Sequence, residues 1–385
     1  MTEQKTELKQ EREQIFWDVY SGKRPKRIPI NMGATVDAAI EYFGYSLLRE
    51  LYSPEKCFEV SDKMAELIDS DSLPVMPNTQ AALFRYVGQR FMVPGADGFF
   101  QHPDLAPMEF DEYPEFISDT LGFIVDKIQP RVFEIVEQDP QLGHVKLKIA
   151  REATAAQFAG MAPKLIQKHQ RASVARPHKI LWAPFDFIAD YIRSFSTILI
   201  DIRRNPQWVT DACEAVCDFQ IKQLDALSGP LPGEISLISV PLHMAPFMRP
   251  KDVQKFWWPT FRRFITAVHQ RGYMPSVFCE ENWDAHLELL DDIEKRTLFS
   301  FETSDQKMIA LKVPSRHIIS HSYPTTLLRN GTKQQCIDTA KETVDNLAGN
   351  GNYIFSPNKS MIRGKDINIS NIQAVIEFLK EYGKY

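Results

Sequence analysis

Potential metal ligands follow successive, largely apolar runs in the C-terminal half of this 385-residue chain. The runs and the side chains that follow them are Pro275–Cys279 with Glu280, Thr297–Phe301 with Glu302, and Arg316–Ser320 with His321. Two carboxylates and one imidazole can hold a divalent metal ion and leave a further position open for a substrate. A carboxylate buried at such a position would also need a cation as its partner. We therefore predict one metal site made by Glu280, Glu302 and His321.

Each of these residues also has an ordinary structural interpretation. Glu280 and Glu302 could cap the helices that follow them, and His321 could be a hydrogen-bonded loop residue. Cys279 is an alternative first ligand. Neighbouring residues of a strand face opposite sides, so Cys279 and Glu280 are not expected to bind one ion together. The repetition on consecutive runs is what favours the metal site.

Two further polar residues follow apolar runs. His243 lies in VPLHMAPF after Ile235–Val240, and Asp186 lies in APFDF after the run His178–Pro184. Both could line the same site and act as catalytic groups together with Glu280. For each of them, an ordinary loop residue is the commoner case.

Other histidines and cysteines are assigned structural roles. His269 and His286 lie in helical stretches and are expected at the surface. Cys213 and Cys217 are spaced as one helix face requires and could bind a metal as a pair, but buried free thiols in a core stripe are commoner. The 5 cysteines are widely spaced and odd in number, so no disulfide scaffold is expected.

The elements that must position these residues alternate between strands and helices. Ile28–Met32 and Asn352–Phe355 are further predicted strands, because they are β-branched or aromatic and are bounded by Gly, Pro or Asn. The clearest predicted helices are Asp252–Arg271, Lys333–Ala348 and Asn371–Tyr382. Such alternation predicts a parallel sheet. The length favours a (β/α)8 barrel, in which the carboxyl ends of all strands open on one face.

The whole chain, 1–385, is predicted to form a single barrel domain with a helical lead-in over 1–26. Ile15, Phe16 and Val19 give the lead-in a short apolar seam. The segment Asp62–Arg131 is rich in Pro, Asp and aromatic residues and is interpreted as a long excursion over one face of the barrel. Such excursions are often functional, so it is a candidate lid or docking surface.

Composition narrows the classes of function. Apolar residues make up 44% and charged residues 25%, as in globular proteins, and the formal charge of −5 argues against a nucleic-acid partner. No apolar run approaches the roughly 20 residues that span a bilayer. The opening stretch MTEQKTELKQEREQ is charged and lacks the apolar core of a signal peptide, so we expect a cytoplasmic protein without a membrane partner.

The chain resembles the uroporphyrinogen decarboxylase superfamily over nearly its whole length. The segments that carry the resemblance are ERE…YSGKRPKRIPI, FDFIADYIRSFSTILIDIRRNPQWV, FMRPKDVQKFWWP, LLRNGTKQQCIDTAKE and NIQAVIEFLKEYGKY. The superfamily implies a (β/α)8 barrel. It contains tetrapyrrole decarboxylases, zinc methyltransferases that pass methyl groups between corrinoid proteins and coenzyme M, and the first methyltransferases of anaerobic O-demethylases.

The motifs that distinguish these activities differ in how well this sequence matches them. The decarboxylases carry arginines after the first strand, whereas the corresponding stretch here, NMGATVDAAIEYFG, has none. The coenzyme M methyltransferases carry His-x-Cys at a strand end, where this chain has Phe278, Cys279 and Glu280. The O-demethylase methyltransferases use two glutamates and a histidine for zinc, which Glu280, Glu302 and His321 resemble in type and order.

The resemblance therefore implies a zinc-dependent methyltransferase. Carboxylate and imidazole ligands leave zinc a hard Lewis acid that suits a substrate oxygen. The methyl group of a methylated, and specifically methoxylated, small molecule would pass to the Co(I) corrinoid of a partner protein. Two alternatives stay open: a decarboxylase of a uroporphyrinogen-like or smaller carboxylate, and a non-catalytic relative that binds a corrinoid or tetrapyrrole.

Overall fold

A six-stranded parallel sheet forms the centre of the computed structural model, which describes the backbone of residues 2–385 and the side chains from residue 7 onward. The strands neighbour one another in chain order, as the alternation of strands and helices predicts. They are β3 (Ala175–Ile180), β4 (Ile235–Leu242), β5 (Met274–Cys279), β6 (Leu298–Phe301), β7 (Ile318–Tyr323) and β8 (Tyr353–Pro357). The α/β fold class is confirmed.

Two irregular segments link the outer strands of this sheet. The backbone N–H of Asn31 donates to Phe355 on β8 at 2.8 Å, and the N–H of Asp71 donates to Ile30 at 2.9 Å. The N–H of Ala172, just before β3, donates to Asp71 at 2.8 Å. The predicted strand Ile28–Met32 is therefore beside β8, where the first strand of a (β/α)8 barrel belongs, although an isolated parallel bridge between Ile30 and Phe355 replaces a continuous ladder.

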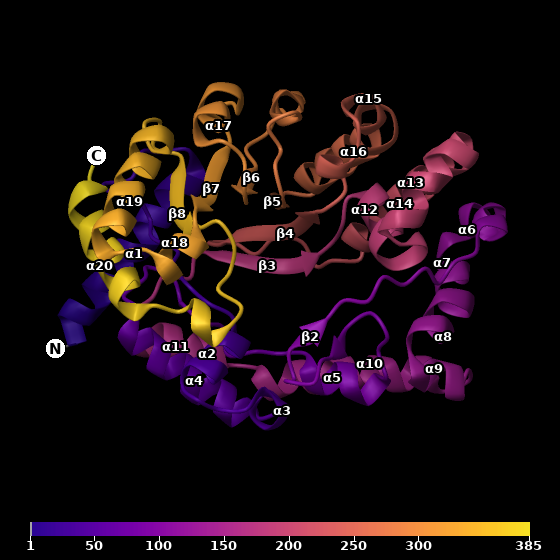
Figure 1. The fold of residues 1–385 in the computed structure, drawn as a ribbon, viewed down its shortest axis with the longest axis horizontal. Helices are drawn as coiled ribbons and strands as arrows, with labels where there is room; N and C mark the ends of the chain where they lie inside the picture. Colours follow the sequence, from indigo (N-terminus) through magenta and orange to yellow (C-terminus); the bar gives the residue numbers. More distant parts are fainter. Residues whose placement is uncertain (1) are drawn as a thin grey trace.

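Helices cover the outer face of the sheet, as Figure 1 shows. Their apolar faces pack on the strands and on one another, so that one large core runs from Ile28 to Leu379. The principal covering helices are α14 (Pro206–Asp225), α16 (Trp258–Gln270), α17 (Gln306–Lys312), α19 (Lys333–Leu347) and α20 (Ile369–Tyr382). Within residues 2–385, no helix combines the length and apolar character that crossing a membrane requires.

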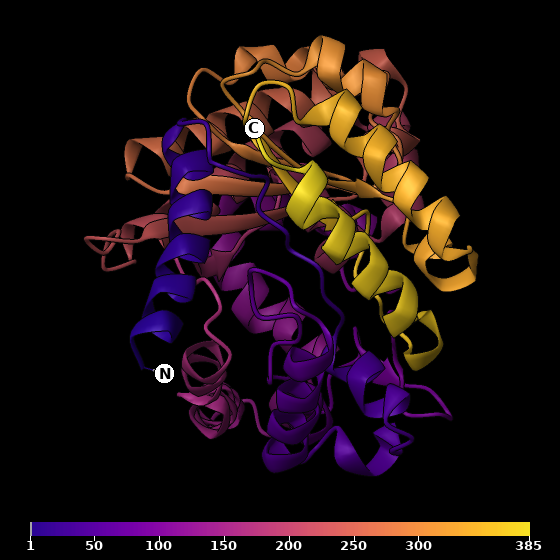
Figure 2. The same cartoon turned by 90° about the vertical axis from the view of Figure 1, so that its left-hand side faces the viewer.

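The N-terminal helix α1 (Thr2–Ser21) lies at the end of the sheet where the strands begin, beside the strands in Figure 2. Its residues Ile15, Phe16 and Val19 are buried, which confirms the predicted apolar seam. They pack against inward-facing side chains of the sheet: Leu237, Leu298, Ile318 and Ile354. The amino ends of the strands are thus covered, while the carboxyl ends face the opposite way and carry the loops that form the mouth of the sheet.

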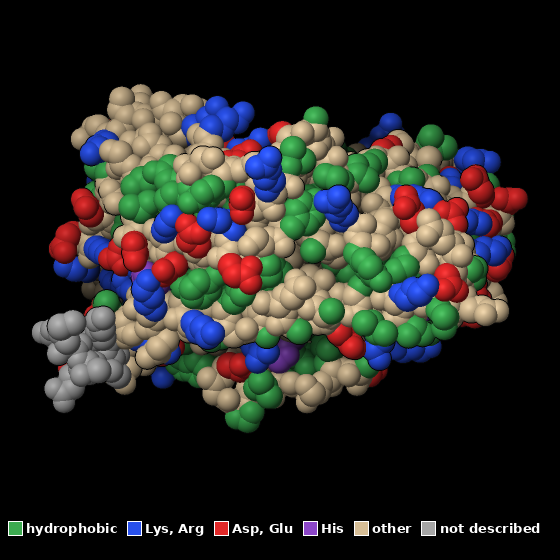
Figure 3. All heavy atoms as spheres, turned by 90° about the horizontal axis from the view of Figure 1, so that it is seen from below, with side chains coloured by type: hydrophobic (Ala, Val, Ile, Leu, Met, Phe, Trp, Pro, Cys, Tyr) green, Lys and Arg blue, Asp and Glu red, His purple; other side chains and the backbone are tan. Residues whose placement is uncertain are grey.

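The predicted excursion Asp62–Arg131 is more helical than its composition suggests. It includes α5 (Ala81–Val87), a short hairpin of β1 (Val93–Pro94) and β2 (Phe100–Gln101), and the helices from α6 (Tyr113–Ser118) to α8 (Gln129–Val132). Together with the neighbouring helices it forms the lower face of the molecule in Figure 1. That face, seen in Figure 3, mixes charges of both signs with apolar side chains.

One predicted strand was placed wrongly, and one predicted helix is confirmed but contains a π-helical turn. The run His178–Pro184 was predicted as a strand, but β3 ends at Ile180 and Pro184 begins α12 (Pro184–Ile188). Proline is favoured at the first position of a helix, because its missing N–H has no partner there. The predicted helix Asp252–Arg271 is interrupted by a π-helical turn at Val253–Trp257.

Candidate active site

The strand ends predicted to converge do lie side by side. Cys279 on β5 pairs with Phe301 on β6, and Phe301 pairs with His321 on β7. Glu280 and Glu302, each one residue further on, therefore leave the sheet at the same level. This confirms the predicted juxtaposition of the strand ends, and the side chains decide what the site contains.

Alternation along β5 separates Glu280 from Cys279. Met274 faces the interior of the sheet, so Phe278 and Glu280 share that face and Cys279 points toward the helices. Cys279 is fully buried, and burial raises the pKa of its thiol well above the ordinary value. The alternative ligand Cys279 consequently lies away from the mouth.

His321 reaches the interior through an unusual backbone conformation. Ile318 faces the interior, so regular alternation would turn His321 toward the helices. Instead φ is 71° at His321 and 72° at Ser322, and the imidazole lies 5.4 Å from the ring of Phe278. Such left-handed residues cost about 1–2 kcal/mol each. Tyr353 holds the turn by donating its hydroxyl to the His321 carbonyl at 2.7 Å.

His243 is clamped between two carboxylates. It follows β4, and its Nδ1 lies 2.8 Å from Asp190 Oδ2 while its Nε2 lies 3.2 Å from Glu280 Oε1. Asp190 comes from the π-helical turn Ala189–Arg193, a type of distortion that is frequent at functional sites. Burial alone would lower the pKa of His243, but the hydrogen bonds to both carboxylates outweigh it and raise the pKa to about 11. His243 is therefore an imidazolium at neutral pH.

Asp186 holds the backbone of His243 in place. Its carboxylate accepts hydrogen bonds from the backbone N–H of His243 at 2.9 Å and of Met244 at 3.3 Å, and from Trp257 Nε1 at 2.7 Å. Burial raises the pKa of Asp186 to about 7. Because Asp186 is fully buried and holds the backbone of His243, the geometry gives it a positioning role rather than contact with a substrate.

Glu302 is held by a lysine and a backbone amide. Lys359 Nζ donates to Glu302 Oε1 at 3.0 Å, and the N–H of Glu281 donates to Oε2 at 3.0 Å. The Glu302 side chain is 10% exposed and that of Lys359 53% exposed. Lys359 thus supplies the cation that a buried carboxylate requires.

Two cavities open at this mouth. The first, called here the His243 cavity, has a volume of about 390 Å³. Its walls include His102, Asp104, Tyr191 and Phe195 beside His243, Glu280 and Asp190. His102 and Asp104 belong to the excursion Asp62–Arg131, so that segment forms part of the wall.

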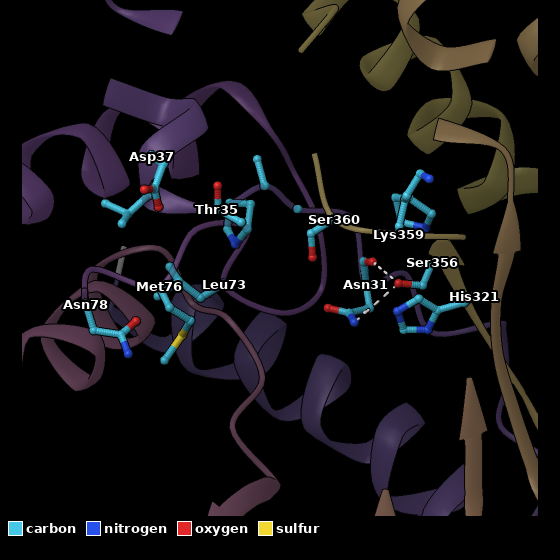
Figure 4. Close-up of a pocket in the computed structure, with 15 residues that line it drawn as sticks. Asn31, Thr35, Asp37, Leu73, Met76, Asn78, His321, Ser356, Lys359 and Ser360 are labelled. Atoms are coloured by element: carbon cyan, nitrogen blue, oxygen red, sulfur yellow. Dashed lines mark hydrogen bonds between the residues drawn. The ribbon is translucent and has the colours of Figure 1, made fainter. Parts of the chain in front are cut away.

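The second cavity, called here the His321 cavity, has a volume of about 410 Å³. Figure 4 shows it with its main lining residues: Asn31, Thr35, Asp37, Leu73, Met76, Asn78, His321, Ser356, Lys359 and Ser360. Lys359 lines this cavity and also contacts Glu302. The segment from Asn31 to Asp37, which begins at the end of the first strand segment Ile28–Met32, therefore lines the same cavity as His321.

His321 presents a free nitrogen to its cavity. Ser320 Oγ donates its proton to the carbonyl of Ile354 at 3.1 Å, so the hydrogen bond between Ser320 Oγ and His321 Nδ1, at 3.2 Å, is donated by Nδ1. Burial lowers the pKa of His321 to about 4, so the ring is neutral. Nε2 of a neutral imidazole protonated on Nδ1 carries a lone pair that can accept a hydrogen bond or bind a metal.

The predicted metal ligands are neighbours but are not gathered around one point. Among the described residues there is no group of three or more His, Cys, Asp or Glu side chains placed to hold a metal ion. Glu280 contacts His243 and Glu302 contacts Lys359, so the chain's own cations occupy both carboxylates. The donor types suit a divalent ion, whereas their present arrangement does not fit one.

Sequence reasoning missed two residues of the site and misplaced one histidine. Asp190 lies four positions after Asp186, and Lys359 lies in SPNKS directly after β8. The rule applied to the other strand ends gives Ser356 here, because the predicted strand Asn352–Phe355 ends four positions before Lys359. His286 was predicted at the surface but is only 3% exposed, because it packs edge-on against Trp283. Cys213 and Cys217 are buried free thiols, as predicted.

Comparison with known proteins gives a family match and similarities to solved structures. The family described as uroporphyrinogen decarboxylase (URO-D) matches residues 179–382, which include every predicted site residue. Among solved structures, the chain is similar to a methyltransferase from Methanosarcina mazei, with 13% identity and a TM-score of 0.60 over 96% of this chain and 98% of that one. At that identity the similarity shows a shared fold. No curated protein matches the sequence.

Proposed function

The chain belongs to the uroporphyrinogen decarboxylase family, and from this premise we propose that it is a methyltransferase. It would move a methyl group from a small methoxylated molecule to the Co(I) corrinoid of a partner protein. The observation that carries the proposal is the position of His243 at the mouth, with the carboxylates of Asp190 and Glu280 on its two ring nitrogens. The fold shared with the Methanosarcina mazei methyltransferase also supports it.

The clamped imidazolium suits the departure of an oxygen. When the C–O bond of a methoxy group breaks and a Co–C bond forms, the electron pair of Co(I) makes the new bond and the oxygen leaves as an anion. A cation aimed at that oxygen stabilises the transition state. His243 Nε2–H would donate to the oxygen in the place that Glu280 Oε1 now occupies, and Asp190 would keep the ring oriented through Nδ1.

Zinc remains part of the proposal, with Glu280, Glu302 and His321 as ligands. The free Nε2 of His321 supports it, because metal-binding histidines commonly donate their other ring N–H to a neighbour, as Nδ1 does here to Ser320. To bind the ion, Glu280 would have to give up its contact with His243, and Glu302 its contact with Lys359. Nε2 of His243 would then be free for the substrate. When bound, zinc would supply a Lewis acid for the substrate oxygen.

The decarboxylase alternative finds little support in the cavities. Among the described residues that line the His243 and His321 cavities there is no arginine, and Lys359 is their single lysine. A polycarboxylate substrate would need several cationic partners. The stretch NMGATVDAAIEYFG, which lacks arginine, contributes Asn31 to Asp37 to the lining.

The proposal is tested by incubating the protein anaerobically with Co(I) cobalamin, free or bound to a corrinoid protein, and a panel of methyl ethers. Loss of the Co(I) absorbance, together with the demethylated product by mass spectrometry, would support it. Release of carbon dioxide from a carboxylate substrate without methylation of cobalt would favour a decarboxylase. Binding of a corrinoid with no turnover of any donor would favour a non-catalytic relative.

A further inference from the structure

The His321 cavity carries groups of opposite charge at its two ends. Figure 4 shows Lys359 at one end and Asp37 at the other, with Leu73 and Met76 on the wall near Asp37. Its volume of about 410 Å³ is ample for a small organic molecule. A ligand that fills it would therefore meet a cation, an apolar wall and a carboxyl group in turn.

At the Lys359 end, some hydrogen-bond donors of Lys359 and Asn31 are available to a ligand. An ammonium carries three N–H donors, and Lys359 uses one of them on Glu302 at 3.0 Å, which also fixes the position of Nζ. Asn31 accepts a hydrogen bond from Ser72 Oγ on its Oδ1, while its Nδ2 makes only a long 3.5 Å contact with Ser356 Oγ. These donors match the oxygens of a carboxylate.

The Asp37 end lacks a cation of its own. Asp37 lies in the first turn of α2 (Val36–Tyr42) and is half-buried, and among the described residues it has no ion-pair partner. Burial and the nearby charge of Glu41 raise the pKa of its carboxyl. A ligand ammonium at this end would stabilise the ionised form of Asp37.

We propose that the His321 cavity binds a small amino-acid-like zwitterion. Its carboxylate contacts Lys359 and Asn31, its ammonium contacts Asp37, and its apolar body packs against Leu73 and Met76. Binding of this class of ligand follows from the cavity itself. Its identification as the methyl donor, with the methoxy group extending from the cavity toward His243, rests on the proposed function.

The test measures binding by calorimetry with the full chain and no corrinoid. The probes are 4-aminobutanoate, 5-aminopentanoate and 6-aminohexanoate, each beside the alkanoate without the amine and the amide without the carboxylate. We expect one chain length to bind best, since the two ends are at a fixed separation. Lys359→Met should weaken that probe about tenfold or more, because hydrogen bonds between charged groups are worth roughly 1.5–3 kcal/mol.

Matched variants make the result decisive. Lys365→Met removes an exposed lysine of the same loop that lies outside the cavity lining, and should leave binding unchanged. Lys359→Arg should retain most of the affinity. Asp37→Asn should weaken the amino acids but not the alkanoates, because only the amino acids carry the ammonium.

Saturable binding by none of the amino acids would overturn the proposal. So would equal affinities in Lys359→Met and Lys365→Met, or a loss in Asp37→Asn that the alkanoates share. Because the measurement needs no methyl transfer, the two proposals can fail separately. Binding without methyl transfer from any donor would count against the proposed function alone.

Discussion

The two cavities at the mouth each present a histidine, and the two histidines are in opposite states. His243 has carboxylates on both ring nitrogens, and its pKa rises to about 11. His321 has a hydroxyl on one nitrogen and none of these charged partners, and burial lowers its pKa to about 4. One ring is a fixed cation and the other a neutral acceptor.

This contrast shows that surroundings, rather than residue type, assign the chemistry of each side of the mouth. The cationic ring suits a departing oxygen. The neutral ring, with its free Nε2, suits a metal ion or a ligand hydroxyl. Lys359 lies between the two sides, since it lines the His321 cavity and contacts Glu302 beside Glu280.

The largest expected effect is on the cationic side. His243→Asn should lower the rate of methyl transfer about 100- to 1000-fold, because it removes the donor aimed at the departing oxygen. The rate is measured from the decay of Co(I) absorbance. His178→Gln is the matched control, since His178 also pairs with a carboxylate, Glu234 at 2.9 Å, but lies on β3 outside the lining of both cavities. Equal rates in the two variants would show that His243 has no role in the reaction.

A second experiment removes one of the two carboxylates that contact His243. Asp190→Asn should lower the free energy of unfolding at pH 7 by about 3 kcal/mol, the typical result of leaving one partner of a buried pair uncompensated. The folded-state pKa of His243 is raised, so its contribution to stability is full below about pH 6.5 and is lost as pH rises through about 11. Urea unfolding from pH 6 to 10 should show a steeper decline in the native protein than in Asp190→Asn.

The same titration in acid distinguishes His321. Its folded-state pKa is lowered, so the unfolded chain binds more protons and stability falls as pH drops from about 6.5 toward 4. His321→Asn should flatten the curve in that window and leave the alkaline window unchanged. If His321→Asn instead altered only the alkaline window, the assignment of a neutral ring would be wrong.

Zinc content tests whether the two sides share an ion. His321→Ala and Glu302→Gln should each weaken zinc binding by at least about 10- to 100-fold, because losing only a hydrogen-bond partner of a metal ligand already has that effect. Cys279→Ser should leave it unchanged, because that thiol faces the helices. Retention of zinc in both ligand variants would place any metal elsewhere, and its loss in Cys279→Ser would restore the thiolate as first ligand.

The smallest expected effect concerns the turn that aims His321. Ser322 has φ of 72°, and its buried Oγ has no hydrogen-bond partner among the described residues. Ser322→Gly should raise the free energy of unfolding by about 1 kcal/mol, because glycine adopts positive φ without strain. Ser320→Gly, at a hydroxyl bonded to Ile354, should do the reverse. Stabilisation by both would exclude backbone strain as the cause.

Much of the fold followed from local pattern. Pro275–Cys279 was predicted where β5 is Met274–Cys279, and Asn371–Tyr382 where α20 is Ile369–Tyr382. Short β-branched or aromatic runs between turn residues permit few other structures. The strand predicted at His178–Pro184 failed because apolar character continues through Pro184 into α12, and hydropathy does not mark where a strand gives way to a helix.

The sequence by itself determined which residues leave the sheet together. Strand ends and a period of two place Glu280 and Glu302 on one level, and local residue types are sufficient for that. Only the tertiary structure decided which charged side chains contact His243, Glu280 and Glu302. Asp190 is 53 residues from His243, and Lys359 is 57 residues from Glu302. No local pattern encodes such contacts, because they depend on how distant segments fold over the mouth.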